Sequence, residues 1–235
     1  MAKIKIKTPK EIELIRDAGA LAAVTLLRAG EMVKPGVSTL EIDEFIGEFT
    51  KKNGGTSACL NYHGYPRYAC ISINDVVCHG IPSKDTILKD GDIVNIDITT
   101  ILSGYHGDTS AMFTVGKPSK DALELVQVTK ECLEIGIAAA AEPNAIYSDI
   151  GNAIQALADE YGFGVVEDYC GHGIGRNFHE EPTVFHFGNR FRSPHIEELA
   201  AKASCYVSAY PNAGLPNEFG AYDEQAHETA HLVDD

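Results

Sequence analysis

Basic residues are scarce in this sequence, and their scarcity restricts the ligands that it can bind. The 235 residues include 19 Lys and Arg against 34 Asp and Glu, which gives a formal net charge of −15. A nucleic-acid backbone is bound through clusters of Lys and Arg, so we expect no nucleic-acid partner. The acidic balance is compatible instead with binding metal cations or the amine terminus of a peptide.

Long apolar runs are missing as well. No segment approaches the roughly 18 consecutive apolar residues that indicate a membrane-spanning helix. The first residues, Met1–Lys7, alternate Lys with Ile and lack the apolar core of a signal peptide. The sequence therefore predicts a cytoplasmic protein without a membrane partner.

Closely spaced cysteines are also absent. The six cysteines form no C-x-x-C pair, so they indicate neither a disulfide framework nor a zinc ribbon. We expect each to be a reduced thiol, for which plain packing is the usual role. They are Cys59, Cys70, Cys78, Cys132, Cys170 and Cys205. With 44% apolar residues, the chain can bury the core of one large domain or two small ones.

Two helix-start signals, each a capping box, occur in the first fifty residues. Apolar residues at helical spacing then predict one helix to about residue 28 and a second to about residue 53. The same spacing predicts two more helices, one after residue 118 and one over residues 148–162. The capping pairs are Thr8 with Glu11 and Ser38 with Glu41.

Runs rich in β-branched residues predict strands between the two pairs of helices. The expected strands are Ala69–Ile73, Val76–Cys78, Ile93–Ile101 and Tyr105–Val115. If the last two fold back about Leu102 and Ser103, Asp97 and Asp108 lie directly opposite each other. Opposed like charges are destabilising unless a cation lies between them, and two such carboxylates suit a pair of metal ions that activates water. The alternative is two solvated carboxylates beside a turn.

The chain resembles itself at an offset of 108 residues. Under this shift the apolar stripes of the first helix pair fall on those of the second, and Gly54 falls on Gly162. Two similar halves would place a functional site at their seam, whereas two generic helix pairs could agree by chance. The offset further predicts a strand over residues 201–209, which contain no carboxylate.

Three histidines lie in segments rich in Gly or Pro, where function tends to concentrate. His172 is flanked by Gly171 and Gly173, His79 precedes Gly80, and His179 lies shortly before Pro182. A neutral imidazole beside carboxylates suits Mn, Fe, Co or Zn better than Ca or Mg. Each histidine taken alone is more often structural, and we assign no role to the others except His63.

The motifs together closely resemble type I methionine aminopeptidase over roughly Ile4 to Gly188. The resemblance rests on the segments 60–66, 77–82, 92–97, 106–110 and 171–182, which occur in the family's order. It implies the α+β pita-bread fold, with two pseudo-symmetric halves and a dinuclear metal site. It also implies a hydrolase that removes the N-terminal methionine from peptides and nascent chains with two divalent metal ions, or a single one. We expect a monomer.

The resemblance assigns a role to individual residues. Asp97, Asp108 and His172 match metal ligands, while His79 and His179 match histidines that act on the substrate and on the tetrahedral intermediate. The carbonyls of Asn74 and Val76 match a monovalent-cation site. The lining of the methionine pocket is matched by Cys59, Tyr62, His63, Tyr65 and Cys70.

The resemblance ends before two further glutamate ligands of the family. The first should fall near Ser208, and serine does not replace an anionic ligand. For the second, Glu228 is the one approximate candidate. Without these ligands the chain could instead be a weak or inactive relative that binds peptides or a single metal ion, or a poorly folded fusion product.

The tail resembles another protein. From about Pro194, several segments including Pro211–Asn217 resemble part of the homocysteine-binding domain of cobalamin-dependent methionine synthase, without its zinc-binding cysteines. We therefore divide the chain into an aminopeptidase-like domain, residues 1–192, and a divergent tail, residues 193–235. The tail would replace the last strands of the family's fold.

Overall fold

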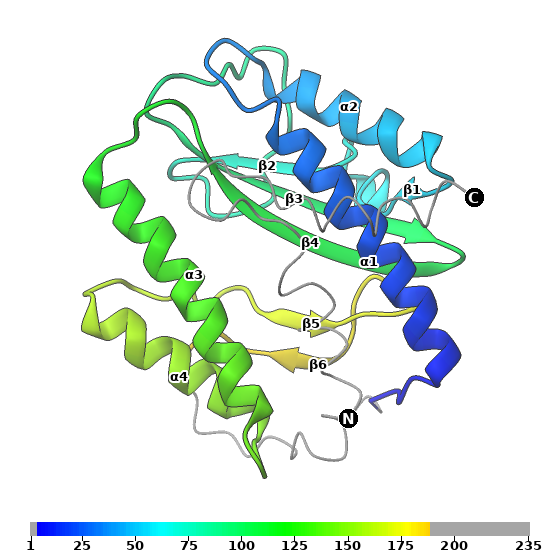
Figure 1. The fold of residues 1–235 in the computed structure, drawn as a ribbon, viewed down its shortest axis with the longest axis vertical. Coiled ribbons are helices and arrows are strands. Elements are labelled where there is room, and N and C mark those ends of the chain that lie inside the picture. The colour runs from blue at the N-terminus through cyan, green and yellow to red at the C-terminus, as the bar shows by residue number, and fades with distance from the viewer. Residues whose placement is uncertain (1–3, 189–235) are drawn as a thin grey trace, which may run out of the picture. The chain divides into compact units, whose positions relative to one another are not determined.

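The computed structural model describes residues 4–188, which divide into two compact units (Figure 1). One unit comprises Glu13–Pro118, and the other comprises residues 4–12 and 119–188. Each unit contains a helix pair and β-strands, so the α+β class expected from the sequence is confirmed. None of the helices in these residues is long and apolar enough to cross a membrane.

The unit Glu13–Pro118 is built on an antiparallel sheet centred on β3. Within the sheet β1 and β2 pair with β3, and β4 forms a long hairpin with it. A short 3₁₀ helix, η1 (Tyr62–Gly64), lies between β1 and β2. The other elements are α1 (Pro9–Gly30), α2 (Thr39–Lys52), β1 (Thr56–Ser57), β2 (Cys70–Ile73), β3 (Ile93–Leu102) and β4 (Tyr105–Thr114).

One face of this sheet is covered by α1 and α2 (Figure 1). Alternate residues of β3, among them Val94, Ile96 and Ile98, are almost completely buried against apolar residues of both helices. The helix starts agree with the sequence, because both predicted capping boxes form their hydrogen bonds. Asp97 lies on the opposite face of β3, away from the two helices.

The hairpin is present, but the predicted register is wrong. Leu102 pairs with Tyr105, so the two turn residues are Ser103 and Gly104, one position later than expected. Both have positive φ, 51° and 77°, as a two-residue primed turn requires. Asp97 therefore lies opposite Ser110 rather than Asp108. The two carboxylates remain on one face as diagonal neighbours, whose spacing of about 7–8 Å is still within reach of side chains.

The unit of residues 4–12 and 119–188 repeats the helix pair. Thr39 and Lys52, the ends of α2, shifted by 108 positions fall on the ends of α4 (Tyr147–Glu160), which supports the predicted offset. Gly54 and Gly162 follow the two helices with similar φ values of 80° and 73°. The remaining elements are α3 (Lys120–Ala141), β5 (Gly171–Gly173) and β6 (Glu180–Val184).

Two strand predictions have other outcomes. Val76–Cys78 is not a strand, because Ile73 ends β2 and a turn follows at residues 74–75. The predicted strand over residues 201–209 lies outside the described residues, as does the boundary between residues 192 and 193. Both stay predictions.

Asp43 of α2 connects the helix to the start of β2 and gives a first testable prediction. Its carboxylate accepts the backbone N–H groups of Tyr68 at 2.8 Å and Ala69 at 2.9 Å, and the residue is 1% exposed. We expect Asp43→Ala to lower the free energy of unfolding by about 2–4 kcal/mol, because two buried donors lose their acceptor. Urea unfolding would measure this, and an unchanged midpoint would contradict it.

The same residue predicts a pH dependence of stability. Burial raises the pKa of Asp43 from 3.8 to about 6, against the opposing effect of its two hydrogen bonds. Because the folded-state pKa is the higher one, this stabilisation is complete below about pH 4 and is lost as the pH rises to about 6. Asp43→Asn keeps the acceptor and should remove this component. The stability difference between wild type and variant should therefore fall over that range.

Candidate metal centre and catalytic residues

Asp97 and Asp108 are brought together by the β3–β4 hairpin. Their side chains are hydrogen-bonded to each other, although Asp97 is half-buried and Asp108 is exposed. Burial, and after it the charge of Asp108, raises the pKa of Asp97 to about 8. Two carboxylates in contact share a proton when nothing else neutralises them. The pair therefore fits a divalent cation, which would take the place of that proton.

Thr99 supports this pair and was not identified from the sequence. Its hydroxyl donates to a carboxylate oxygen of Asp108 at 2.9 Å, and Thr99 lies directly opposite Asp108 in the hairpin. The alternation of side chains along a strand places Thr99 on the same face as Asp97, two residues away. That alternation could have identified it. A hydrogen bond of this kind fixes the orientation of a carboxylate that binds metal.

Three of the residues expected to line the methionine pocket cluster beside Asp97. Cys70 lies opposite Asp97 across β2 and β3, and its thiol is hydrogen-bonded to Cys59 and Tyr65. Both thiols are buried. The hydrogen bond between the two thiols, together with burial, raises the pKa of Cys59. The same hydrogen bond lowers the pKa of Cys70 to about 7. The sulfur atoms and the phenol form a soft, polarisable cluster next to the carboxylates.

The other two residues expected in that pocket lie in the loop between these cysteines. Tyr62 and His63 are exposed on η1, with ring centroids 4.4 Å apart and edge-to-face geometry. Asn74 and Val76, expected at a monovalent-cation site, lie after β2. There the side-chain amide of Asn74 donates to the carboxylate of Asp92, and Asn74 exchanges hydrogen bonds with Ile93.

His79 has its backbone in the left-handed region, with φ of 55°. The next residue is held against β2, because Gly80 donates to the Ser72 hydroxyl at 3.1 Å and its carbonyl accepts the Ile71 N–H at 2.9 Å. A Cβ at Gly80 would lie 2.2 Å from the carbonyl oxygen of Ile71, so only glycine fits there. The imidazole of His79 is exposed.

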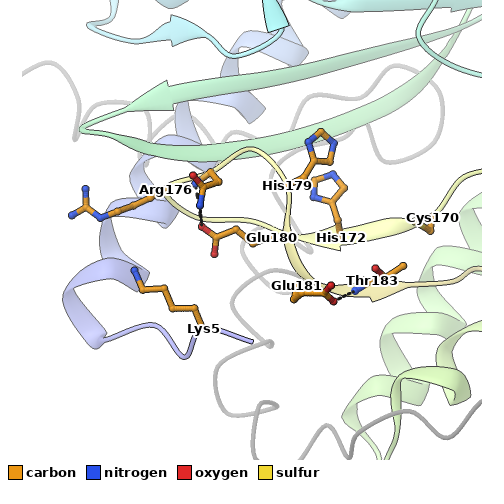
Figure 2. A pocket seen from close by; sticks show the side chains of 9 residues that line it. Lys5, Cys170, His172, Arg176, His179, Glu180, Glu181 and Thr183 are labelled. Carbon is orange, nitrogen blue, oxygen red and sulfur yellow. Dashed lines mark hydrogen bonds between the residues drawn. The ribbon is translucent and has the colours of Figure 1, made fainter. Parts of the chain in front are cut away.

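His172 and His179 lie together in the other unit. Their ring centroids are 4.1 Å apart, and Figure 2 shows both rings above β5. The Nδ1 atom of His172 is 2.9 Å from the carbonyl oxygen of Gly173, which would fix the tautomer of the ring. The rings border a pocket of about 730 Å³. It is lined by Lys5, Cys170, His172, Arg176, Asn177, His179, Glu180, Glu181 and Thr183.

The three metal ligands expected from the resemblance are thus divided between the two units. Within residues 4–188, no group of three or more His, Cys, Asp or Glu side chains is arranged to hold a metal ion. Ser208 and the candidate ligand Glu228 lie outside the described residues, as does the segment resembling methionine synthase. Their predicted roles stay predictions.

Known proteins that are similar to this chain include methionine aminopeptidases. Residues 13–224 match the model of metallopeptidase family M24. The methionine aminopeptidase of Escherichia coli strain K12 is 52% identical over 188 residues, which are 80% of this chain and 71% of that protein. The crystal structure of methionine aminopeptidase from Rickettsia prowazekii is similar with a TM-score of 0.79 and 44% identity, over 82% of this chain and 77% of that one. Prolidase from Pyrococcus furiosus shares the fold at 24% identity, with a TM-score of 0.70 over 81% of this chain and 53% of that one.

Proposed function

The chain belongs to metallopeptidase family M24 and has its α+β pita-bread fold, and from this premise we propose that it removes the N-terminal methionine from peptides. The observation that carries the proposal is the contact between Asp97 and Asp108, beside the cluster of Cys59, Tyr65 and Cys70. A carboxylate pair suits divalent metal ions, and thiols with an aromatic ring suit a thioether. Identity to methionine aminopeptidases over most of the chain supports the same activity.

In this proposal Asp97, Asp108 and His172 hold the divalent ions, and Glu228 is a further ligand. Bound divalent ions lower the pKa of water, so that it can attack a peptide carbonyl at neutral pH. Mn, Fe, Co and Zn suit this donor set, with two ions or one bound. Thr99 keeps Asp108 oriented through its hydroxyl.

The histidines act on the substrate. His79 hydrogen-bonds near the free amine and the scissile amide, and His179 donates to the carbonyl oxygen on which negative charge develops. Donors placed in advance at that atom stabilise the transition state more than the ground state. The left-handed backbone of His79 and the tight packing of Gly80 fix the backbone from which the imidazole projects.

The remaining parts of the proposal concern the substrate and its surroundings. The methionine side chain is enclosed by Cys59, Cys70 and Tyr65, together with Tyr62 and His63 from the loop between the cysteines. The carbonyls of Asn74 and Val76 bind a monovalent cation. The substrates are peptides or nascent chains with an N-terminal methionine, and the enzyme acts as a cytoplasmic monomer that binds neither nucleic acid nor membranes.

The experiment that tests the function is release of free methionine from Met-Ala-Ser by the purified full chain. We expect release that depends on added Mn(II) or Co(II), because the carboxylate pair needs a cation to act. Leu-Ala-Ser should be cleaved far more slowly if the thiols and Tyr65 select the thioether. High-performance liquid chromatography of the free amino acids measures both.

An absence of release from folded protein at every metal concentration would overturn the proposal. It would favour the alternative expected from Ser208, a relative that keeps the fold but binds peptides or one metal ion without turnover. Isothermal titration with Mn(II) would then measure how many ions bind. A chain that does not fold would show neither methionine release nor metal binding, and circular dichroism would identify that case.

A further inference from the structure

Lys7 is a buried lysine in the segment that precedes α1. The residue is only 5% exposed, and its amine pairs with the carboxylate of Glu180, whose side chain is 9% exposed. Lysine is almost never buried to this extent unless its charge is paired. The two residues are 173 positions apart in the sequence. The pair therefore ties the N-terminal segment to the start of β6.

Glu180 closes the turn that carries His179. One carboxylate oxygen pairs with Lys7, and the other accepts the backbone N–H of Asn177 at 3.0 Å and its side-chain amide at 3.3 Å. Gly175 donates to the carbonyl of Asn177 at 3.2 Å. The turn from residue 175 to residue 180 is thus held by hydrogen bonds to the carboxylate of Glu180 and to the carbonyl of Asn177.

The amine of Lys7 fits into this turn without spare room. A Cβ at Gly175 would lie 2.7 Å from the Lys7 amine and 2.9 Å from a carboxylate oxygen of Glu180. Burial opposes the charge of Glu180, yet the hydrogen bonds from Lys7 and Asn177 outweigh it and lower the pKa of Glu180. The carboxylate of the pair therefore favours its charged form, and the pair is closely packed and directly adjacent to His179.

We propose that Lys7 is a positioning residue for catalysis, because it holds Glu180 and thereby fixes the turn that presents His179 beside His172. The imidazole of His179 is exposed, and its ring packs on His172 and Phe178, so its place depends on the backbone of this turn. This inference rests on the proposed role of His179 in methionine release. A loss of alignment of about 1 Å can reduce turnover about 100-fold without affecting substrate binding.

The test compares four forms of the full chain: wild type, Lys7→Met, the double variant Lys7→Met with Glu180→Gln, and Lys10→Met. Lys10 is an exposed lysine three positions later, in the first turn of α1, and serves as the matched control. We expect Lys7→Met to lower kcat for Met-Ala-Ser at least about 10-fold with KM almost unchanged, because the turn moves but the methionine pocket does not. Lys10→Met should keep wild-type kcat and KM.

The double variant separates positioning from stability. Lys7→Met alone leaves an unpaired buried carboxylate and should lower Tm, whereas removing both charges should restore much of it. Positioning predicts that kcat stays low in the double variant despite the recovered Tm. Recovery of kcat together with Tm would overturn the proposal, since Lys7 would then only stabilise the fold.

A second readout does not depend on activity. Hydrogen exchange of the Asn177 amide in the metal-free protein should be faster in Lys7→Met and in the double variant than in wild type or Lys10→Met. If wild type releases no methionine, the proposed function fails but this measurement still tests whether Lys7 holds the turn. Unchanged exchange in Lys7→Met would overturn the inference whatever the activity.

Discussion

Replacing either aspartate of the β3–β4 hairpin, Asp97→Ala or Asp108→Ala, should abolish both stoichiometric metal binding and methionine release. The two carboxylates contact each other, and burial with the charge of Asp108 raises the pKa of Asp97 to about 8. A bound cation would relieve that repulsion, so the two carboxylates together should bind a cation more tightly than either one alone. We expect Mn(II) affinity to fall at least about 100-fold, because replacing even a residue that only supports a metal ligand can lower metal affinity by that factor.

Asp85→Ala is the matched control, because Asp85 is an exposed carboxylate of the same unit outside the hairpin. Isothermal titration with Mn(II) and metal analysis of the purified proteins measure the binding, and Met-Ala-Ser hydrolysis measures the consequence. Wild-type Mn(II) affinity in both hairpin variants would rule out this metal centre. The metal-free Asp108→Ala protein should also unfold at a higher urea concentration than wild type at pH 8, because one of two repelling charges is gone.

Replacing the histidines, His79→Ala or His179→Ala, should reduce kcat about 100- to 1000-fold while metal content stays near that of wild type. Both are proposed to donate hydrogen bonds where charge develops on the substrate, and loss of one such donor typically costs this much. They lie in different units and on different loops, so one variant does not disturb the other site directly. Steady-state kinetics with metal analysis on the same preparations separates the two effects.

His186→Ala provides the control, because His186 lies beyond β6 and has no assigned role. Metal lost from His79→Ala would move His79 into the coordination shell and contradict its assignment to the substrate. Unchanged kcat in His179→Ala would remove the basis for positioning by Lys7, whereas unchanged kcat in His79→Ala alone would leave that inference intact. The two histidines are therefore best tested separately.

The local features of the fold could be predicted from the sequence because their causes are local. Capping boxes and helical spacing located the helix starts, and the offset of 108 residues located α4 from α2. Alternation of apolar residues identified the hairpin and placed both aspartates on one face. The register was missed because a two-residue turn can form at neighbouring positions, and the one adopted has Ser103 and Gly104 with positive φ.

By itself the sequence determined the family, the helix pairs and the identity of the candidate ligands, because these depend on residue types and short spacings. The tertiary structure alone decided that Asp97 and Asp108 are diagonal neighbours, that Thr99 supports Asp108, and that Cys59 and Cys70 meet. It also decided the pairing of Lys7 with Glu180, for which a separation of 173 positions leaves no local signal. Contacts between distant segments depend on how buried charges and hydrogen-bonding groups are satisfied once the chain has packed, and no local pattern specifies that.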